Sequence, residues 1–164
     1  MNTLKIALIL LLLPWQVRSE TEKLEGDIHI MLEVTAQPKI DVEIPHSINL
    51  IRSPKNNGLY SASVPIAVTL RRQESFRVSV TQPLILARHS GVTQEFSPAE
   101  IHWGTGSANM YLLSIDPKTF NIAKTTSSQT STDYLLQITA QAPNGPDIAG
   151  QYHGQLTLLF ETNS

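Results

Sequence analysis

The strongest constraint on the fold of this chain is an alternation of apolar and polar residues that recurs along most of its length. The first such run has Ile28, Ile30, Leu32, Val34 and Ala36 at every second position. Successive side chains of a β-strand point to opposite faces, so this period predicts strands with one buried face. No stretch of helical length after residue 19 places its apolar residues at helical spacing. The chain is therefore predicted to be all-β.

The same alternation returns several times before the C-terminus. It covers residues 40–44, 64–70, 76–80 and 152–160, and shorter apolar stretches lie at 84–87, 100–104, 110–115 and 134–140. Ten prolines and eight glycines separate these runs, and segments 56–58 and 144–147 have the composition of tight turns. Many short strands at regular spacing are typical of a β-sandwich or a β-barrel.

Two segments carry more specific expectations. Pro65 cannot donate a backbone hydrogen bond, so we expect it at a sheet edge, at a strand entry or at a bulge. Residues 114–131 are polar and rich in serine and threonine, and we expect them to form a long loop.

The first 19 residues have the order of a secretory signal peptide. Lys5 supplies a positive charge, residues 6–13 are an unbroken apolar run, and Val17 and Ser19 suit the −3 and −1 positions of a cleavage site. A membrane anchor is the alternative, but this run is roughly half of the ~20 residues that cross a bilayer. We expect cleavage after Ser19, export through the inner membrane and a single mature domain of about 145 residues.

Composition excludes several classes of function. The chain has no cysteine, which excludes disulfides, thiol catalysis and cysteine-ligated zinc. Removal of Lys5 and Arg18 with the signal peptide leaves 10 basic and 14 acidic residues, a net charge of about −4. Because no basic stripe is present, binding to nucleic acid through its phosphates is not expected.

The sequence contains no recognisable catalytic or metal-binding motif. None of its five histidines stands in an H-E-x-x-H motif, and no G-x-S-x-G motif offers a serine nucleophile. Asp41 and Glu43 fall on one strand face, which suits paired catalytic acids, but alternation with apolar residues favours a solvated outer face. We predict no catalytic, cofactor-binding or metal-binding residues, and hence no enzyme.

Two further features each allow a binding role and a structural role. Arg71, Arg72 and Arg77 form the only basic cluster, which suits contact with an acidic glycan, lipid or protein, or a charged strand end that prevents wrong edge pairing. Trp103 is either a platform on which a sugar stacks or part of the core.

The strand expected at residues 28–36 has two possible positions. It is either the first strand of its own sheet or a strand that fills a gap in another copy of the chain. A sandwich that lacks one strand leaves an apolar trough open, at a cost of ~25 cal/mol per Å². A strand from another molecule can fill such a trough, and repetition of this head-to-tail contact builds a fibre.

Three stretches resemble one known family. The stretch from Ile30 to Val42 has a β-rich run that ends in Thr-Ala, then a proline, then Ile-Asp and an apolar residue. This resembles the mature N-terminus of class 5 pilins, the colonisation-factor-antigen-I-type subunits of the alternate chaperone–usher pathway. Residues 149–158 are similar to the small-Gly-x-Tyr-x-Gly-x-Leu-x-Leu pattern of the pilin C-terminal strand, and residues 101–104 to an internal apolar-x-Trp-Gly pattern.

The resemblance implies an immunoglobulin-like β-sandwich that is incomplete and is completed by a donor strand. It divides the chain after the signal peptide, residues 1–19, into a donor-strand extension, residues 20–37, and a pilin domain, residues 38–164. The side chains that it implies for insertion into the next subunit are Ile28, Ile30, Leu32 and Val34. The residues that it implies for the acceptor edge strand are Tyr152, Gly154, Leu156, Leu158 and Phe160.

The resemblance also implies a function. The chain would be a structural subunit of a surface fimbria that is assembled by donor-strand exchange and supports cell adhesion. Its partners would be identical or related pilin subunits, a periplasmic chaperone and an outer-membrane usher, and its locations the periplasm and then the cell surface. The residues leave a second function open, that of a self-complete secreted or periplasmic β-sandwich that binds a glycan or a protein.

Overall fold

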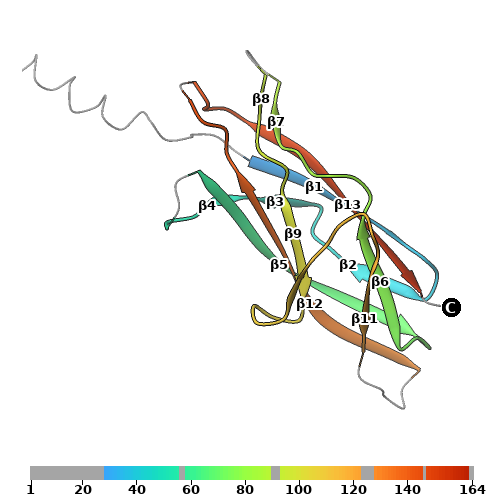
Figure 1. Ribbon diagram of the computed structural model, residues 1–164. Helices are drawn as coiled ribbons and strands as arrows, with labels where there is room; N and C mark the ends of the chain where they lie inside the picture. Colours follow the sequence, from blue (N-terminus) through green and yellow to red (C-terminus); the bar gives the residue numbers. More distant parts are fainter. Residues whose placement is uncertain (1–27, 56–57, 90–92, 123–127, 146, 163–164) are drawn as a thin grey trace, which may run out of the picture.

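A computed structural model describes residues 28–55, 58–89, 93–122, 128–145 and 147–162. These residues form two β-sheets that pack face to face (Figure 1). The predicted all-β sandwich is therefore confirmed. The signal peptide and the first part of the predicted donor extension lie outside the described residues. No helix in the described part of the chain has the length and apolar character needed to cross a membrane.

The first sheet, called sheet A, has the order β11-β6-β13-β1-β3; the short strand β7 also pairs with β13, and β8 pairs with β7. Its strands are β1 (Ile28–Ala36), β3 (Ser47–Asn49), β6 (Ser75–Val80), β7 (Ala87–Arg88), β8 (Gln94–Glu95), β11 (Lys118–Asn121) and β13 (Tyr152–Thr162). The second sheet, called sheet B, has the order β10-β9-β12-β5-β2, and β4 also pairs with β5. Its strands are β2 (Ile40–Glu43), β4 (Ile51–Arg52), β5 (Leu59–Arg71), β9 (Glu100–Gly104), β10 (Met110–Leu112) and β12 (Gln129–Gln141).

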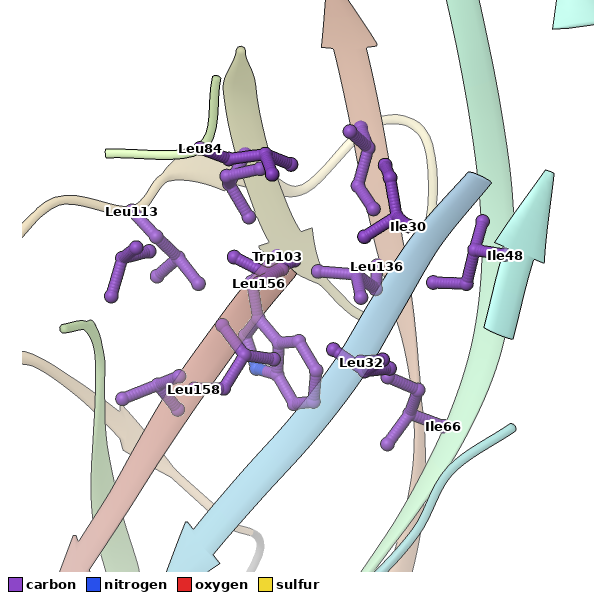
Figure 2. Close-up of a cluster of buried hydrophobic side chains, with 14 of the residues drawn as sticks. Ile30, Leu32, Ile48, Ile66, Leu84, Trp103, Leu113, Leu136, Leu156 and Leu158 are labelled. Atoms are coloured by element: carbon purple, nitrogen blue, oxygen red, sulfur yellow. The ribbon is translucent and has the colours of Figure 1, made fainter. Parts of the chain in front are cut away.

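One apolar core fills the space between the two sheets. Every second residue of the long strands faces it, as the period-two pattern predicted. Figure 2 shows the centre of this core, to which Ile30 of β1, Leu156 of β13 and Trp103 of the opposite sheet contribute. Trp103 is fully buried, so of its two predicted roles the structure shows the core one.

The prediction that residues 114–131 form one long loop is wrong in two places. Residues 118–121 form β11, which pairs with β6 at the edge of sheet A, and β12 already begins at Gln129. An edge strand with one solvated face needs few apolar residues, and in β11 only Phe120 is buried. The composition of this segment therefore resembled that of a loop. The strands expected at 84–87 and 110–115 are also shorter than predicted, at Ala87–Arg88 and Met110–Leu112.

Proline and glycine lie where their backbone chemistry suits them. Pro65 lies on β5 between the stretch paired with β2, residues 67–70, and the stretch paired with β4, residues 60–61. The strand has no partner on this side at Pro65 among the described residues, so the missing donor leaves no ladder bond unmade. Gly58 and Gly145, at the two predicted turns, have positive φ angles of 86° and 118°. Residues 56, 57 and 146 of these turns lie outside the described residues.

Candidate functional site

The candidate site is the position of β1 between β13 and β3, called here the β1 slot. β1 runs parallel to β13 over nine register pairs, from Ile28↔Tyr152 to Ala36↔Phe160 (Figure 1). On its other side it pairs antiparallel with β3, from His29↔Asn49 to Met31↔Ser47. The open trough expected from the resemblance is therefore absent from the described structure, because this chain's own β1 fills it. Of the two positions that the sequence allowed for this strand, the structure shows the first.

The side chains predicted for insertion all lie on the core face of β1. Ile28, Ile30 and Leu32 are buried, and Val34 is half-buried against the same core. In Figure 2, Ile30 and Leu32 lie beneath β1 and reach toward Leu136 of the opposite sheet. The apolar side chains that the sequence predicted on one face of β1 are therefore the ones that close the core of this chain. Their insertion into a second molecule stays a prediction.

The predicted acceptor residues lie on β13, beside β1. Tyr152, Leu156, Leu158 and Phe160 are fully buried. Here β13 is an interior strand, because β1 covers one side of it and β6 and β7 cover the other. It would become the edge of a gap only if β1 left the slot.

Gly154 of β13 has a packing role that explains why a side chain is missing at this point of the strand. A Cβ atom there would lie 2.8 Å from Leu84 Cδ1 and 2.9 Å from Leu86 Cδ2. These leucines lie in the segment that leads to β7 and cover the core beside β13. A side chain at this position would make both leucine side chains shift, so the Tyr-x-Gly-x-Leu spacing of β13 is consistent with close packing.

On the outer face of the slot, two histidines meet across the boundary between β1 and β13. His29 and His153 are register partners, and their rings stack with centroids 5.8 Å apart and planes 14° apart. The two histidines are 124 residues apart in the sequence. No local pattern could have revealed this pair, because only the parallel alignment of β1 with β13 brings the two residues together.

The end of β1 is fastened to the end of β13 by Gln37. Its backbone N–H donates to the Phe160 carbonyl at 3.1 Å. Its side-chain Oε1 accepts from the backbone N–H of Thr162 at 2.9 Å and from the Thr162 hydroxyl at 3.2 Å. After Gln37 the chain crosses to sheet B within two residues, and Lys39 has a positive φ of 79°. Residues 37–39 are therefore the short connection between β1 and sheet B, called here the hinge.

The segment before β13 is held by a buried arginine. Arg88 Nη1 donates to the carbonyls of Asp147, at 2.9 Å, and Ala149. Its guanidinium lies 6.0 Å from the ring centroid of Tyr152, whose hydroxyl donates to the Ile148 carbonyl at 2.6 Å. Burial raises the pKa of Tyr152, partly offset by the positive charge of Arg88, so the phenol stays protonated at neutral pH. Arg88 was not among the residues predicted for the site, although its position directly after the apolar run 84–87 is a sign of burial.

The other candidate residues lie apart from the slot's core face. Asp41 and Glu43 are exposed, and Asp41 pairs with Arg71 at 3.0 Å. Arg77 pairs with Glu161 at 3.5 Å. Two of the three arginines of the basic cluster therefore have carboxylate partners. Among the described residues, no three histidine, aspartate or glutamate side chains converge on a point that could hold a metal ion.

Comparison with known proteins supports the fold. No protein-family model matches the chain, and no curated protein sequence matches it. Among solved structures, the fold is similar to that of the CooA pilin subunit from enterotoxigenic Escherichia coli, with a TM-score of 0.52 and 15% sequence identity. The similarity covers 77% of this chain and 99% of that chain. At this identity the likeness is one of fold, and it confirms the sandwich that the sequence resemblance implied.

Proposed function

We propose that this chain is a structural subunit of a surface fimbria, and that its copies are joined by exchange of β1. In the isolated chain β1 occupies its own slot, and in the fibre it occupies the slot of the next copy. The observation that carries the proposal is the composition of the slot. A strand at the N-terminal end of the domain, joined to the rest by the short hinge 37–39, supplies three buried core residues between β13 and β3. The pilin-like fold supports the same conclusion.

Exchange preserves the interactions that the slot requires. The same apolar side chains are buried whether β1 comes from the same chain or from a neighbour, so little apolar burial is lost. The hinge imposes a parallel direction on β1, whereas a strand from another molecule is free to enter in either direction. Antiparallel pairing is slightly more stable per residue than parallel pairing, so entry antiparallel to β13 strengthens the longer of the two contacts and makes the shorter contact with β3 parallel. Because each copy gives a strand and receives one, the contact repeats without closing and produces a fibre.

Export and delivery follow from this function. A subunit with a predicted signal peptide would reach the periplasm unpolymerised, and its slot would need protection until assembly. A periplasmic chaperone and an outer-membrane usher, which the sequence resemblance implies, would supply that protection and the route to the surface. The fimbria would then support adhesion. Catalysis has no place in this function.

One observation favours the second function, that of a self-complete binding module. β1 lies in its own sheet, as it would in a protein that never exchanges it. The two functions differ in whether β1 ever leaves the slot, so a reversible lock on β1 separates them.

The lock is an engineered disulfide between β1 and β13. The chain has no cysteine of its own that could form a competing disulfide. His29 and His153 are register partners on adjacent strands, where Cα atoms are about 4.8 Å apart, a separation that a disulfide spans. In the double variant His29→Cys/His153→Cys, the oxidised protein should stay monomeric, and reduction should restore polymers that resemble those of the unchanged chain. Size-exclusion chromatography and electron microscopy measure this, with each single cysteine variant as a control. Polymers from the oxidised double variant, or monomers under all conditions, would overturn the proposal.

A further inference from the structure

A second feature lies outside the β1 slot, at the side of the sandwich where the edge strands β10 and β11 face each other. A hollow of about 380 Å³ opens there between the two sheets. The residues that line it include Thr105, Asn109, Tyr111, Lys118, Phe120 and Tyr134. No residue of β1 lines it, so occupation of the hollow is independent of strand exchange.

The hollow exists because sheet B narrows at this point. β9 pairs with β12 only as far as Gly104↔Leu135, and β12 continues to Gln129 without a partner on that side among the described residues. The chain after Gly104 turns back tightly, since a Cβ at this glycine would lie 1.8 Å from the Asn109 carbonyl oxygen. The space beyond the end of β9 is therefore left unfilled, and Tyr134 of β12 forms its floor.

Tyr134 provides a hydrogen-bond donor at this floor. Its ring is packed against Trp103, with centroids 5.0 Å apart, and edge-on against Phe76 at 5.4 Å. The residue is only 4% exposed, and it is one of the residues that line the hollow. Burial raises the pKa of Tyr134, so the hydroxyl keeps its proton and can donate. A phenol that lines a hollow can donate its proton to an acceptor on a ligand there.

The charge of the hollow indicates an anionic ligand. Lys118 is the one charged residue that lines it within the described chain, and no carboxylate there neutralises it. The Lys118 ammonium lies 4.8 Å from the ring centroid of Tyr111, where it faces the aromatic ring. A ligand carboxylate could accept a charge-assisted hydrogen bond from this ammonium.

The wall of the hollow is aromatic and its rim is polar. Tyr111 is 47% exposed and meets Phe120 edge-on at 5.9 Å. Aromatic faces suit the apolar C–H face of a sugar ring, while Thr105 and Asn109 offer hydroxyl and amide groups to its oxygens. The volume falls within the range of roughly 300–1,000 Å³ that small-molecule sites occupy.

We propose that the hollow between β10 and β11 binds an acidic saccharide, a sugar ring that carries a carboxylate. The carboxylate pairs with Lys118, the ring lies against Tyr111 and Phe120, and a ring oxygen accepts from the Tyr134 hydroxyl. The monomer and the fimbrial subunit would both present this site, because it shares no residue with the slot.

The test is titration of the exported, purified chain with D-glucuronic acid, followed by calorimetry and by NMR. We expect millimolar binding of glucuronic acid, about tenfold tighter than binding of glucose, which lacks the carboxylate. Benzoate, which has a ring and a carboxylate but no hydroxyls, should bind at least several-fold more weakly than glucuronic acid. Absence of glucuronic acid binding in the tens of millimolar, equal binding of glucose, or equal binding of benzoate would each overturn the proposal.

Matched variants locate the site. Lys118→Gln should remove the preference for glucuronic acid over glucose, and Tyr134→Phe should weaken both sugars several-fold while it keeps the aromatic core. Lys55→Gln, an exposed lysine elsewhere, and Tyr60→Phe, a buried tyrosine outside the hollow, serve as controls and should bind like the unchanged chain. Unchanged binding by Lys118→Gln and Tyr134→Phe would place the ligand elsewhere and refute the assignment. Because this readout uses the monomer, its failure is distinct from a failure to polymerise.

Discussion

Gln37 and Thr162 fasten the C-terminal end of β1 to that of β13. One amide oxygen of Gln37 accepts from both the backbone N–H and the hydroxyl of Thr162, at 2.9 and 3.2 Å. These contacts hold β1 in its own slot at the hinge from which it would swing outward. Release of β1 has to break them, so they oppose exchange in the isolated chain.

Gln37→Ala should therefore speed polymerisation. Loss of the side-chain contacts should destabilise the monomer by about 0.5–1.5 kcal/mol and increase the fraction of time that β1 spends outside the slot. Thermal unfolding measures the first effect, and the growth of polymer with time measures the second. Gln82→Ala, at an exposed glutamine in a bend, is the control. A polymerisation rate equal to that of the control would contradict the prediction.

Leu32→Glu should weaken both the closed monomer and the fibre. Leu32 is 4% exposed, and a carboxylate at this position would be buried without a partner, at a cost of several kcal/mol. We expect reduced thermal stability of the monomer and little polymer, while export stays intact. Met31→Glu, one residue earlier on the same strand but 61% exposed, is the matched control and should change little. A normal polymer yield from Leu32→Glu would count against a role for β1 in assembly.

Gly154→Ala should destabilise the domain through crowding beside β13. The new methyl group would lie within 3 Å of Leu84 Cδ1 and Leu86 Cδ2, which have to move. Overpacking of this kind costs about 1–3 kcal/mol. Chemical denaturation measures the change. Gly106→Ala is the control, because a Cβ there meets no atom within 4 Å. Equal stability of the two variants would contradict the prediction that a side chain at Gly154 is too crowded to fit without cost.

Arg88→Met should destabilise the domain far more than the same change at a surface arginine. Arg88 is buried and donates to two carbonyls of the segment before β13, which would then lose their partner. Asp147 and Ala149 are themselves exposed, so the cost comes from the lost hydrogen bonds of the charged guanidinium, about 1.5–3 kcal/mol each. Arg71→Met, which breaks an exposed ion pair with Asp41, should cost less than about 1 kcal/mol. Denaturation midpoints compare the two variants, and a larger loss of stability in Arg71→Met than in Arg88→Met would contradict the role of Arg88 in holding the segment before β13.

Local patterns predicted the strands whose two faces differ most in polarity. β1 follows the predicted run from Ile28 to Ala36, and β9 follows the predicted 100–104 strand. β11 was missed because an edge strand buries so few side chains that Phe120 alone identifies its inner face. Arg88 and the two stacked histidines were missed for a different reason. Their roles depend on partners more than 50 residues away along the chain.

By itself the sequence determined the all-β class and the face of each long strand that is buried, because a strand's side chains alternate and apolar area must leave water. It also determined which side chains of β1 fill the slot. Only the tertiary structure decided which strands β1 pairs with. The alternation of apolar and polar residues specifies which face of a strand is buried, but it does not specify the neighbouring strand. That choice rests on long-range pairing with β13 and β3, and on contacts such as that of Gln37 with Thr162.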